Sequence, residues 1–235
     1  MEIPQLHHCT NFESLCSILD SKEFWPSFCL EQSDFMKEFS EAAYAVVCFA
    51  DLLSDEVRRH LYTFKKDSYI KMRKEWAVAN TISPVVYYTK GTIPSTTMKK
   101  WTNFIVDNQD QIDINGSEEL LYKSTSLMFA YMKQYEGVYF DDKKEKFSDE
   151  KRVFYLEREW RWVPLVKNGE AFYLPIDRFL DREIRAQKKD ELINHGYTLK
   201  FTPQDIMEFG IPKDKVAKFR ENLKKEFDNI KIVEL

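Results

Sequence analysis

The residues with the clearest capacity for chemistry are two glutamates separated by one residue, Glu157 and Glu159, followed by Arg161. They lie in an aromatic and β-branched stretch, residues 153–163, which predicts a β-strand. Because side chains alternate along a strand, the three charged groups would share one face and the two tryptophans of the stretch the other. Two carboxylates about 7 Å apart repel each other unless a cation lies near. Such a pair could orient a ligand and stabilise a developing sugar cation. A solvated strand face with one salt bridge is the simpler interpretation.

Metal-binding and phosphate-binding motifs are absent from the sequence. The four histidines have no spacing typical of metal ligands, and the six glycines are scattered, which argues against P-loop and Rossmann sites. The cysteines lack a C-x-x-C spacing and have apolar neighbours, which predicts buried thiols; they are Cys9, Cys16, Cys29 and Cys48. We therefore expect no metal cofactor.

Composition indicates a folded protein. Of the 235 residues, 43% are hydrophobic, and the net charge of −4 does not support a nonspecific nucleic-acid surface, although a local basic groove remains open. No apolar run approaches the ~20 residues that span a bilayer. The N-terminus lacks the basic and apolar regions of a secretion signal. We expect a cytoplasmic protein with no membrane partner.

The N-terminal segment predicts a strand followed by a helix. Residues 3–9 suit a strand that carries His8, and apolar residues at helical spacing continue to about Ser21. Thr10 and Glu13 have the form of a capping box at the start of this helix. His8 and Thr10 would then lie at a strand-to-helix junction, where capping alone is the simpler role for Thr10.

The remaining pattern predicts one α+β domain over residues 1–235, with a helical insertion or cover at about 95–135. The charged stretch 140–151 is typical of an exposed loop. Residues 171–174 would form a hairpin with the glutamate strand across 167–169. Further strands are expected at 24–30, 45–49, 68–74, 84–89, 197–201 and 230–234, and further helices at 54–62, 177–196 and 213–227, with a short helix capped by Thr202.

Several blocks occur in the order seen in the AbiGi-like family of bacterial abortive-infection proteins, which this chain resembles. The most specific block is E-R-E-W-R-W-V-P at 157–164; the others lie at 6–10, 47–51, 74–77, 84–87, 132–137 and 199–206. The resemblance implies a role in defence against phage. It also implies an antitoxin-like protein with a toxin or another defence protein as partner.

A second similarity is to the ADP-ribosyltransferase fold, as in DarT-like enzymes, and it implies NAD as substrate. It implies that Glu159 stabilises the oxocarbenium-like ribose as nicotinamide leaves and that Glu157 positions or activates the acceptor. His8 and Thr10 would bind the adenosine ribose, and Tyr62 or Tyr69 would stack on nicotinamide. The residues expected to hold NAD are therefore His8, Thr10, Tyr62, Tyr69 and Arg161.

Three hypotheses remain open: an NAD-using transferase or glycohydrolase, a non-enzymatic antitoxin on the same fold, and an α+β domain whose glutamates form a structural salt bridge. Family members tend to be glycine-rich before Lys74, where this chain has Lys66, Tyr69 and Lys71. Bulky residues there would fill space that a nucleotide needs. The enzyme hypothesis requires His8 and Glu159 to lie on one side of the sheet, in a cleft shared with Tyr62 or Tyr69.

Overall fold

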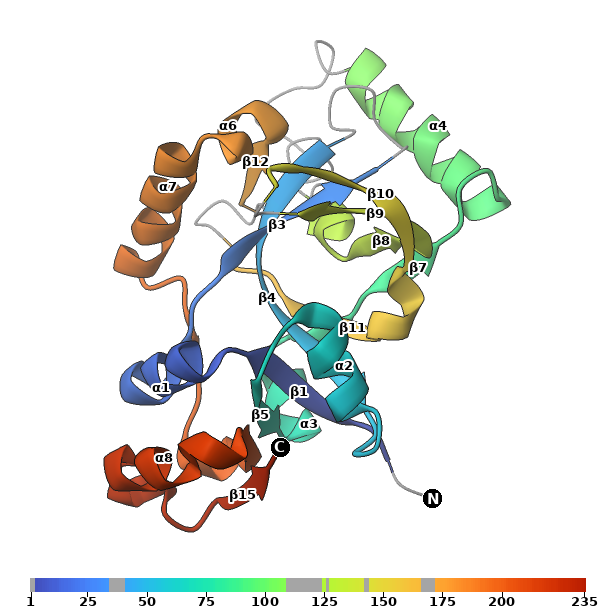
Figure 1. The fold of residues 1–235 in the computed structure, drawn as a ribbon. Coiled ribbons are helices and arrows are strands. Elements are labelled where there is room, and N and C mark those ends of the chain that lie inside the picture. The colour runs from blue at the N-terminus through green and yellow to red at the C-terminus, as the bar shows by residue number, and fades with distance from the viewer. Residues whose placement is uncertain (1–2, 34–40, 109–123, 126, 142–143, 166–171) are drawn as a thin grey trace.

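The computed structural model describes residues 3–33, 41–108, 124–125, 127–141, 144–165 and 172–235 (Figure 1). These residues form a mixed α+β fold, as expected from the sequence. The strands are β1 (Gln5–Thr10), β2 (Glu23–Phe24), β3 (Ser27–Gln32), β4 (Glu41–Leu52), β5 (Ser68–Met72), β6 (Ser83–Pro84), β7 (Val86–Tyr88), β8 (Met132–Gln134), β9 (Glu136–Asp141), β10 (Lys146–Val153), β11 (Glu159–Trp162), β12 (Tyr173–Pro175), β13 (Leu199–Lys200), β14 (Ile206–Ile211) and β15 (Lys231–Glu234).

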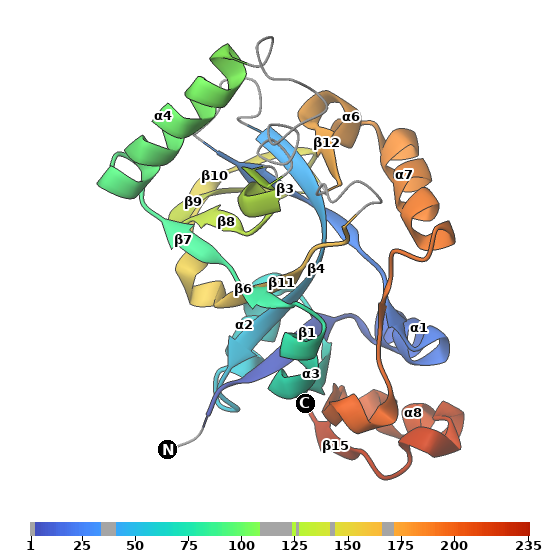
Figure 2. The same cartoon turned by 180° about the vertical axis from the view of Figure 1, so that it is seen from behind.

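The helices surround these strands. They are α1 (Phe12–Ser21), α2 (Val57–Phe64), α3 (Lys74–Ala79), α4 (Ile93–Asp107), α6 (Ile176–Leu180), α7 (Arg182–Asn194) and α8 (Val216–Asn222), with short 3₁₀ turns that include η1 (Phe154–Glu157). In both views α1 and α8 lie in the lower half of the molecule, whereas α4, α6 and α7 lie around the upper half (Figures 1 and 2).

A nine-stranded sheet with the order β15-β14-β5-β1-β4-β11-β6 organises the fold, and β3 and β12 also pair with β4. Strand β4 is the strand of this sheet that pairs with the most described neighbours. It pairs with β3 and β12 along its first half and with β1 and β11 along its second half. The sequence predicts the middle of this strand from its continuous apolar run, which is typical of a strand buried on both faces.

The two faces of the central strands differ in chemistry. One face carries the main apolar core, in which Val47, Phe49, Ile70 and Met72 pack with residues of α1, α3 and α8. The opposite face carries the polar side chains of β11, and α2 covers part of it through Val57 and Leu61, among other contacts. Alternation along each strand therefore separates an apolar side from a partly polar side.

The stretch 153–163 is not one strand, so that prediction is wrong in part. Strand β10 ends at Val153, η1 follows, and Arg158 adopts a left-handed conformation with φ 43° before β11 begins at Glu159. This reversal carries the chain from the β9–β10 hairpin into the central sheet. Glu157 therefore belongs to η1 and does not alternate with Glu159. Trp160 and Trp162 are half-buried and pack against the main core, as expected.

Other predictions need correction where long-range pairing decides the structure. Within the charged stretch 140–151, residues 140–141 lie in β9 and residues 146–151 in β10, and these two strands pair as a hairpin; β12 pairs with β4 rather than with β11. Residues 84–89 divide between β6 and β7, which belong to different sheets, and residues 213–227 hold α8 between two 3₁₀ turns. Of the block 95–135, the described parts contain most of α4, helical residues at 124–125 and 127–130, and β8.

Capping at the first helix also differs from the prediction. Thr10 ends β1, Asn11 is the N-cap of α1, and the Phe12 amide donates to Asp67 Oδ1 at 2.8 Å. A carboxylate from the segment before β5 thus replaces the expected threonine. The predicted position of Thr202 as N-cap is confirmed, because a 3₁₀ turn starts at Pro203 and Asp205 Oδ2 accepts from the Thr202 N–H at 2.7 Å. The helix ending at Ser21 is confirmed as well.

Candidate functional site

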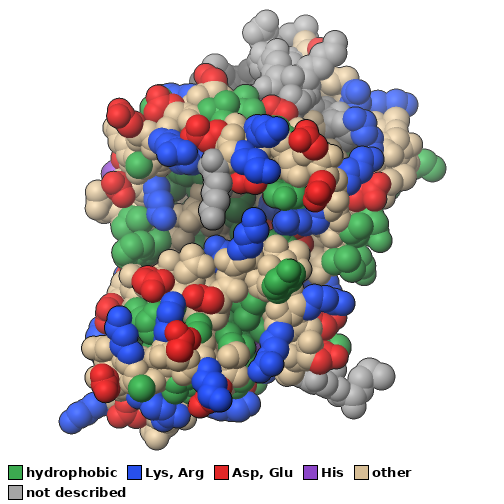
Figure 3. Space-filling model, viewed as in Figure 1, with side chains coloured by type: hydrophobic (Ala, Val, Ile, Leu, Met, Phe, Trp, Pro, Cys, Tyr) green, Lys and Arg blue, Asp and Glu red, His purple; other side chains and the backbone are tan. Residues whose placement is uncertain are grey.

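A cavity of about 470 Å³ opens beside the polar face of the sheet. Its lining includes residues from β1, β3, β4, α2, β8, β9, β10, η1 and β11, so elements from both halves of the molecule border it. The space-filling view shows the molecule hollowed at mid-height, with Lys and Arg side chains beside the hollow (Figure 3). The volume is within the range of small-molecule sites.

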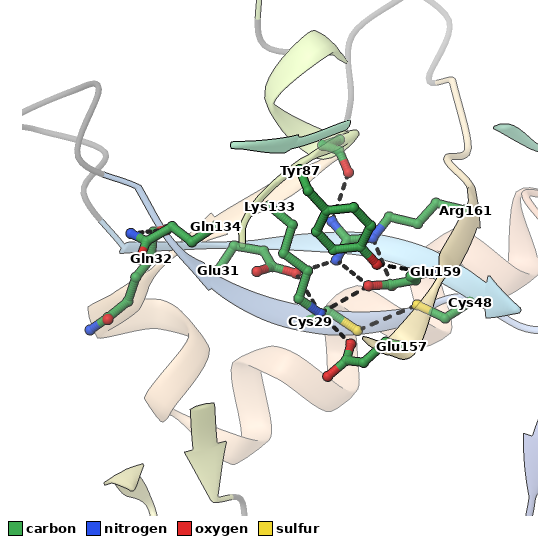
Figure 4. Close-up of polar contacts among 11 residues, drawn as sticks. Cys29, Glu31, Gln32, Cys48, Tyr87, Lys133, Gln134, Glu157, Glu159 and Arg161 are labelled. Carbon is green, nitrogen blue, oxygen red and sulfur yellow. Dashed lines mark hydrogen bonds and ion pairs between the residues drawn. The ribbon is translucent and has the colours of Figure 1, made fainter. Parts of the chain in front are cut away.

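Glu159 and Arg161 form the centre of a buried ion network in this lining (Figure 4). The guanidinium is bidentate: Arg161 Nε donates to Glu159 Oε1 at 2.8 Å and Nη2 donates to Glu159 Oε2 at 3.0 Å. Arg161 also donates to Glu31 and, at 2.8 Å, to the Ala130 carbonyl oxygen. Since Arg161 is completely buried, these acceptors replace the water that its charge would otherwise require.

Lys133 from β8 joins the same network. Its Nζ donates to Glu157 Oε2 at 2.8 Å and to Glu159 Oε2 at 2.9 Å, and it lies 3.8 Å from Glu31 Oε1. Three carboxylates therefore surround two cations (Figure 4). The network ties together four elements, of which β3 and β8 are far in the sequence from each other and from the adjacent pair η1 and β11.

The two glutamates of the E-R-E block have opposite titration behaviour. Burial raises the pKa of the Glu159 carboxyl, but Arg161 and Lys133 outweigh burial and hold that pKa well below its usual range. Burial also raises the pKa of Glu157, and Lys133 offsets this only in part, so that pKa remains above its usual value. Glu159 is thus fixed as a carboxylate, whereas Glu157 takes up a proton more readily.

Two further groups adjoin Glu159. Its backbone N–H donates to the hydroxyl oxygen of Tyr87 at 2.9 Å, which fixes the start of β11. Cys48, on β4 opposite Arg161, has its Sγ 3.9 Å from Cys29 Sγ. The contact with Cys29 and burial raise the pKa of the Cys48 thiol well above its usual value, so it is not poised as a nucleophile.

His8 and Glu159 do not lie on the same side of the sheet, contrary to expectation. Both line the cavity. However, the His8 ring packs edge-on against Phe24, with centroids 4.8 Å apart, and lies 5.5 Å from Phe49 in the apolar core. Its Nδ1 lies 2.9 Å from the Cys48 carbonyl oxygen, and burial lowers its pKa to about 4. The histidine on the Glu159 side is His7, because both residues are register partners of Ala50.

The other residues expected to hold NAD are dispersed. Tyr62 is 87% exposed on α2, and Tyr69 is buried with its hydroxyl donating to Glu208 Oε1 at 2.8 Å. Neither tyrosine lines the cavity, and Thr10 is also absent from its lining. Of the predicted site residues, the cavity thus brings together Glu157, Glu159, Arg161 and His8, with His8 on the opposite face.

Sequence reasoning missed Glu31, Lys133, Tyr87 and His7 as parts of this region. Lys133 lies in the block 132–137 and Tyr87 ends the block 84–87, so both could have been noticed there. Glu31 carries no such signal. In the described part of the chain, no three His, Cys, Asp or Glu side chains are placed to hold a metal ion. Every described helix is too short or too polar to cross a lipid bilayer.

Comparison with known proteins gives evidence on the family of this chain but none on its fold family. Residues 22–209 match the family model described as "Putative abortive phage resistance protein AbiGi, antitoxin". The chain is also 22% identical over 204 residues to an abortive phage resistance protein AbiGi from Lactococcus lactis subsp. cremoris, covering 78% of this chain and 80% of that protein. No solved structure matches the chain. Similarity to the ADP-ribosyltransferase fold stays a prediction.

Proposed function

Because the chain belongs to the AbiGi family of abortive phage resistance proteins, we propose that it acts as a non-enzymatic antitoxin in phage defence. In this role it binds and restrains a toxic protein partner. The family description supports the role, and the similar lactococcal protein supports the setting of abortive infection. The observation that supports a non-enzymatic role is that both carboxylate oxygens of Glu159 accept hydrogen bonds from Arg161 or Lys133.

A carboxylate that stabilises a sugar cation must present an oxygen to the ligand. Both oxygens of Glu159 are occupied by Arg161 and Lys133, and the residue is only 6% exposed. Releasing one oxygen would break a buried ion pair, at a cost of several kcal/mol. The E-R-E block therefore supports a structural role, in which charged side chains hold four elements together.

Growth of a bacterial host tests the antitoxin role. The genes that flank this one in its native locus are each expressed alone and together with this chain. We expect one flanking gene to stop growth and this chain to restore it, and the two proteins to copurify. Growth arrest by this chain alone, or a locus without a toxic neighbour, would contradict the proposal.

NAD cleavage is the second candidate, and the cavity next to Glu157 favours it. Glu157 Oε1 has no hydrogen-bond partner among the described residues, and Glu157 lines the cavity. On this hypothesis the wild-type protein releases nicotinamide, Glu159→Gln abolishes release at an unchanged melting temperature, and Glu157→Gln impairs transfer to an acceptor more than it impairs NAD cleavage.

The antitoxin proposal predicts the opposite result for Glu159→Gln. Removal of the charge leaves Arg161 and Lys133 incompletely paired, so the melting temperature falls, and neither protein consumes NAD. Nicotinamide release and thermal unfolding of the wild type and both variants, with and without extract from phage-infected cells, distinguish the two. Turnover by the wild type would overturn the non-enzymatic proposal.

A further inference from the structure

The cavity retains polar groups that the ion network does not use. Its described lining includes four cations, of which Lys133 and Arg161 are paired with the three glutamates. The other two cations, Lys66 and Arg152, form no ion pair with any described carboxylate. The cavity lining therefore holds two positive charges that no described carboxylate balances.

Arg152 is held in place by aromatic rings. Its guanidinium lies 4.0 Å from the ring centroid of Tyr139 and 4.8 Å from that of Phe64, and all three residues line the cavity. Lys66 follows Phe64 by two residues and is half-buried. Stacking fixes the orientation of a guanidinium while its N–H groups stay able to bind an anion. Lys66 and Arg152 thus both line the cavity, as does Phe64, on which Arg152 stacks.

His60 is affected by the positive charge in this region. It lies one turn before Phe64 on α2, with ring centroids 4.5 Å apart, and it lines the cavity. Burial is the main reason that its pKa falls to about 4, and the charges of Arg158, Arg152 and Arg59 lower it further. An anion placed here would be attracted by the same charges.

His7 contributes a buried acceptor without a partner. Its Nδ1 lies 2.8 Å from the Gln5 carbonyl oxygen, and its pKa is lowered to about 4, mainly by burial. The neutral ring therefore donates through Nδ1, and Nε2 carries the lone pair. Nε2 is buried and has no hydrogen-bond partner among the described residues. Because His7 lines the cavity, a hydroxyl group bound there could supply the missing donor.

We propose that this cavity binds a small phosphorylated sugar, free or as part of a nucleotide. The phosphate lies between Lys66 and Arg152, and sugar hydroxyl groups donate to His7 Nε2 and to the free oxygen of Glu157. A phosphate dianion matches two unpaired cations better than a single carboxylate does, and guanidinium binds phosphate oxygens in a bidentate manner. The excess of carboxylates at the Glu159 network repels the phosphate and so fixes which end of the ligand lies there.

Calorimetric titration of the purified full-length chain tests this inference. The probes are ribose 5-phosphate, ribose, inorganic phosphate and adenosine monophosphate. We expect ribose 5-phosphate to bind more tightly than either ribose or phosphate, because each of these lacks half of the contacts. Stronger binding of adenosine monophosphate than of ribose 5-phosphate would identify a nucleotide as the source of the phosphorylated sugar, and the reverse order would identify a free sugar phosphate.

Matched variants locate the ligand. Lys66→Gln and Arg152→Gln should each weaken ribose 5-phosphate binding by about tenfold or more, since each removes a charge-assisted contact. The controls Lys65→Gln and Lys151→Gln make the same change one position away, at exposed residues outside the lining, and should leave affinity unchanged. His7→Phe should weaken binding, and His7→Gln, which keeps an acceptor, should restore part of it.

Two results would overturn the inference. One is the absence of binding for both phosphorylated probes to a wild-type chain whose thermal unfolding is cooperative. The other is equal weakening by the cavity variants and their exposed controls, which would indicate nonspecific attraction to surface charge. Neither result affects the growth assay for antitoxin activity, because that assay requires no small ligand.

Discussion

Two buried glutamates on the polar side of the sheet, Glu159 and Glu208, differ in how their charge is balanced. Both are almost inaccessible, with exposed fractions of 6% and 8%. Glu159 is bound by two cations, Arg161, whose side chain is fully buried, and Lys133, whose side chain is only 11% exposed. Glu208 accepts from the Tyr69 hydroxyl at 2.8 Å and from Lys231 Nζ at 3.0 Å, and the Lys231 side chain is 70% exposed.

The difference indicates how each network responds to the loss of one charged partner. Around Glu159, loss of one member leaves buried charges incompletely paired. Around Glu208, water can replace the exposed Lys231 and the neutral Tyr69 hydroxyl supplies another bond, so only the buried Lys71, whose Nζ lies 3.6 Å from Glu208 Oε1, is a shielded cation among the described partners. The pKa of both carboxyls is lowered despite burial: by Arg161 and Lys133 for Glu159, and by Lys231, Tyr69 and Lys71 for Glu208. Glu159 and Glu208 are thus similarly buried, but their charges depend to different degrees on buried partners.

Arg161→Met should have the largest effect on stability. It leaves Glu159 and Glu31 in the interior with Lys133 as their remaining cation, so we expect the free energy of unfolding to fall by about 3–5 kcal/mol. Chemical denaturation measures the change. The double variant Arg161→Met with Glu159→Met removes both charges and should recover part of the loss. A single variant as stable as the wild type would show that the network contributes little.

Glu208→Gln should cost less, about 1–2 kcal/mol, because the amide oxygen can still accept from Tyr69 or from the buried Lys71, and Lys231 can turn toward solvent. The same denaturation experiment applies, with Glu234→Gln as a control at an exposed position of the neighbouring strand. A loss equal to that of Arg161→Met would remove the distinction between the networks.

His7 lies between the two networks, and its protonation makes the stability of the fold depend on pH. It is the cross-strand partner of Ala50, as Glu159 is, and its ring packs edge-on against Tyr69. Burial lowers its folded pKa to about 4, below the ordinary value of 6.5, while Lys71, Glu208 and His60 also act on it. The unfolded chain therefore binds the proton first as pH falls. The stabilising contribution is complete above pH 6.5 and is lost as pH falls toward 4.

The variant His7→Phe isolates this contribution. Its free energy of unfolding should fall less steeply on acidification than that of the wild type, by up to about 1.4 kcal/mol per pH unit. His8 and His60 retain their own proton uptake in both proteins, so the comparison concerns His7 alone. Parallel pH profiles would indicate that His7 titrates in the fold as it does in the unfolded chain.

The sequence predicted the elements whose local pattern is strong. The apolar run in β4, the alternating β5, the helix ending at Ser21 and the cap at Thr202 are confirmed. Predictions failed where local pattern and long-range pairing disagree. The charged stretch 140–151 forms a hairpin because β9 and β10 pair with each other, and composition alone cannot reveal that partner.

The candidate site shows the same division. Residue types by themselves determined that Glu159 and Arg161 share a face of a strand and that the chain carries the ordered blocks of the AbiGi family. Only the tertiary structure decided that Lys133 and Glu31 complete the network, that Glu157 enters it from a 3₁₀ turn, and that His7 rather than His8 lies on that side. The physical reason is that alternation is fixed by local backbone geometry, whereas the partners of a buried charge are set by strand register and by elements distant in sequence.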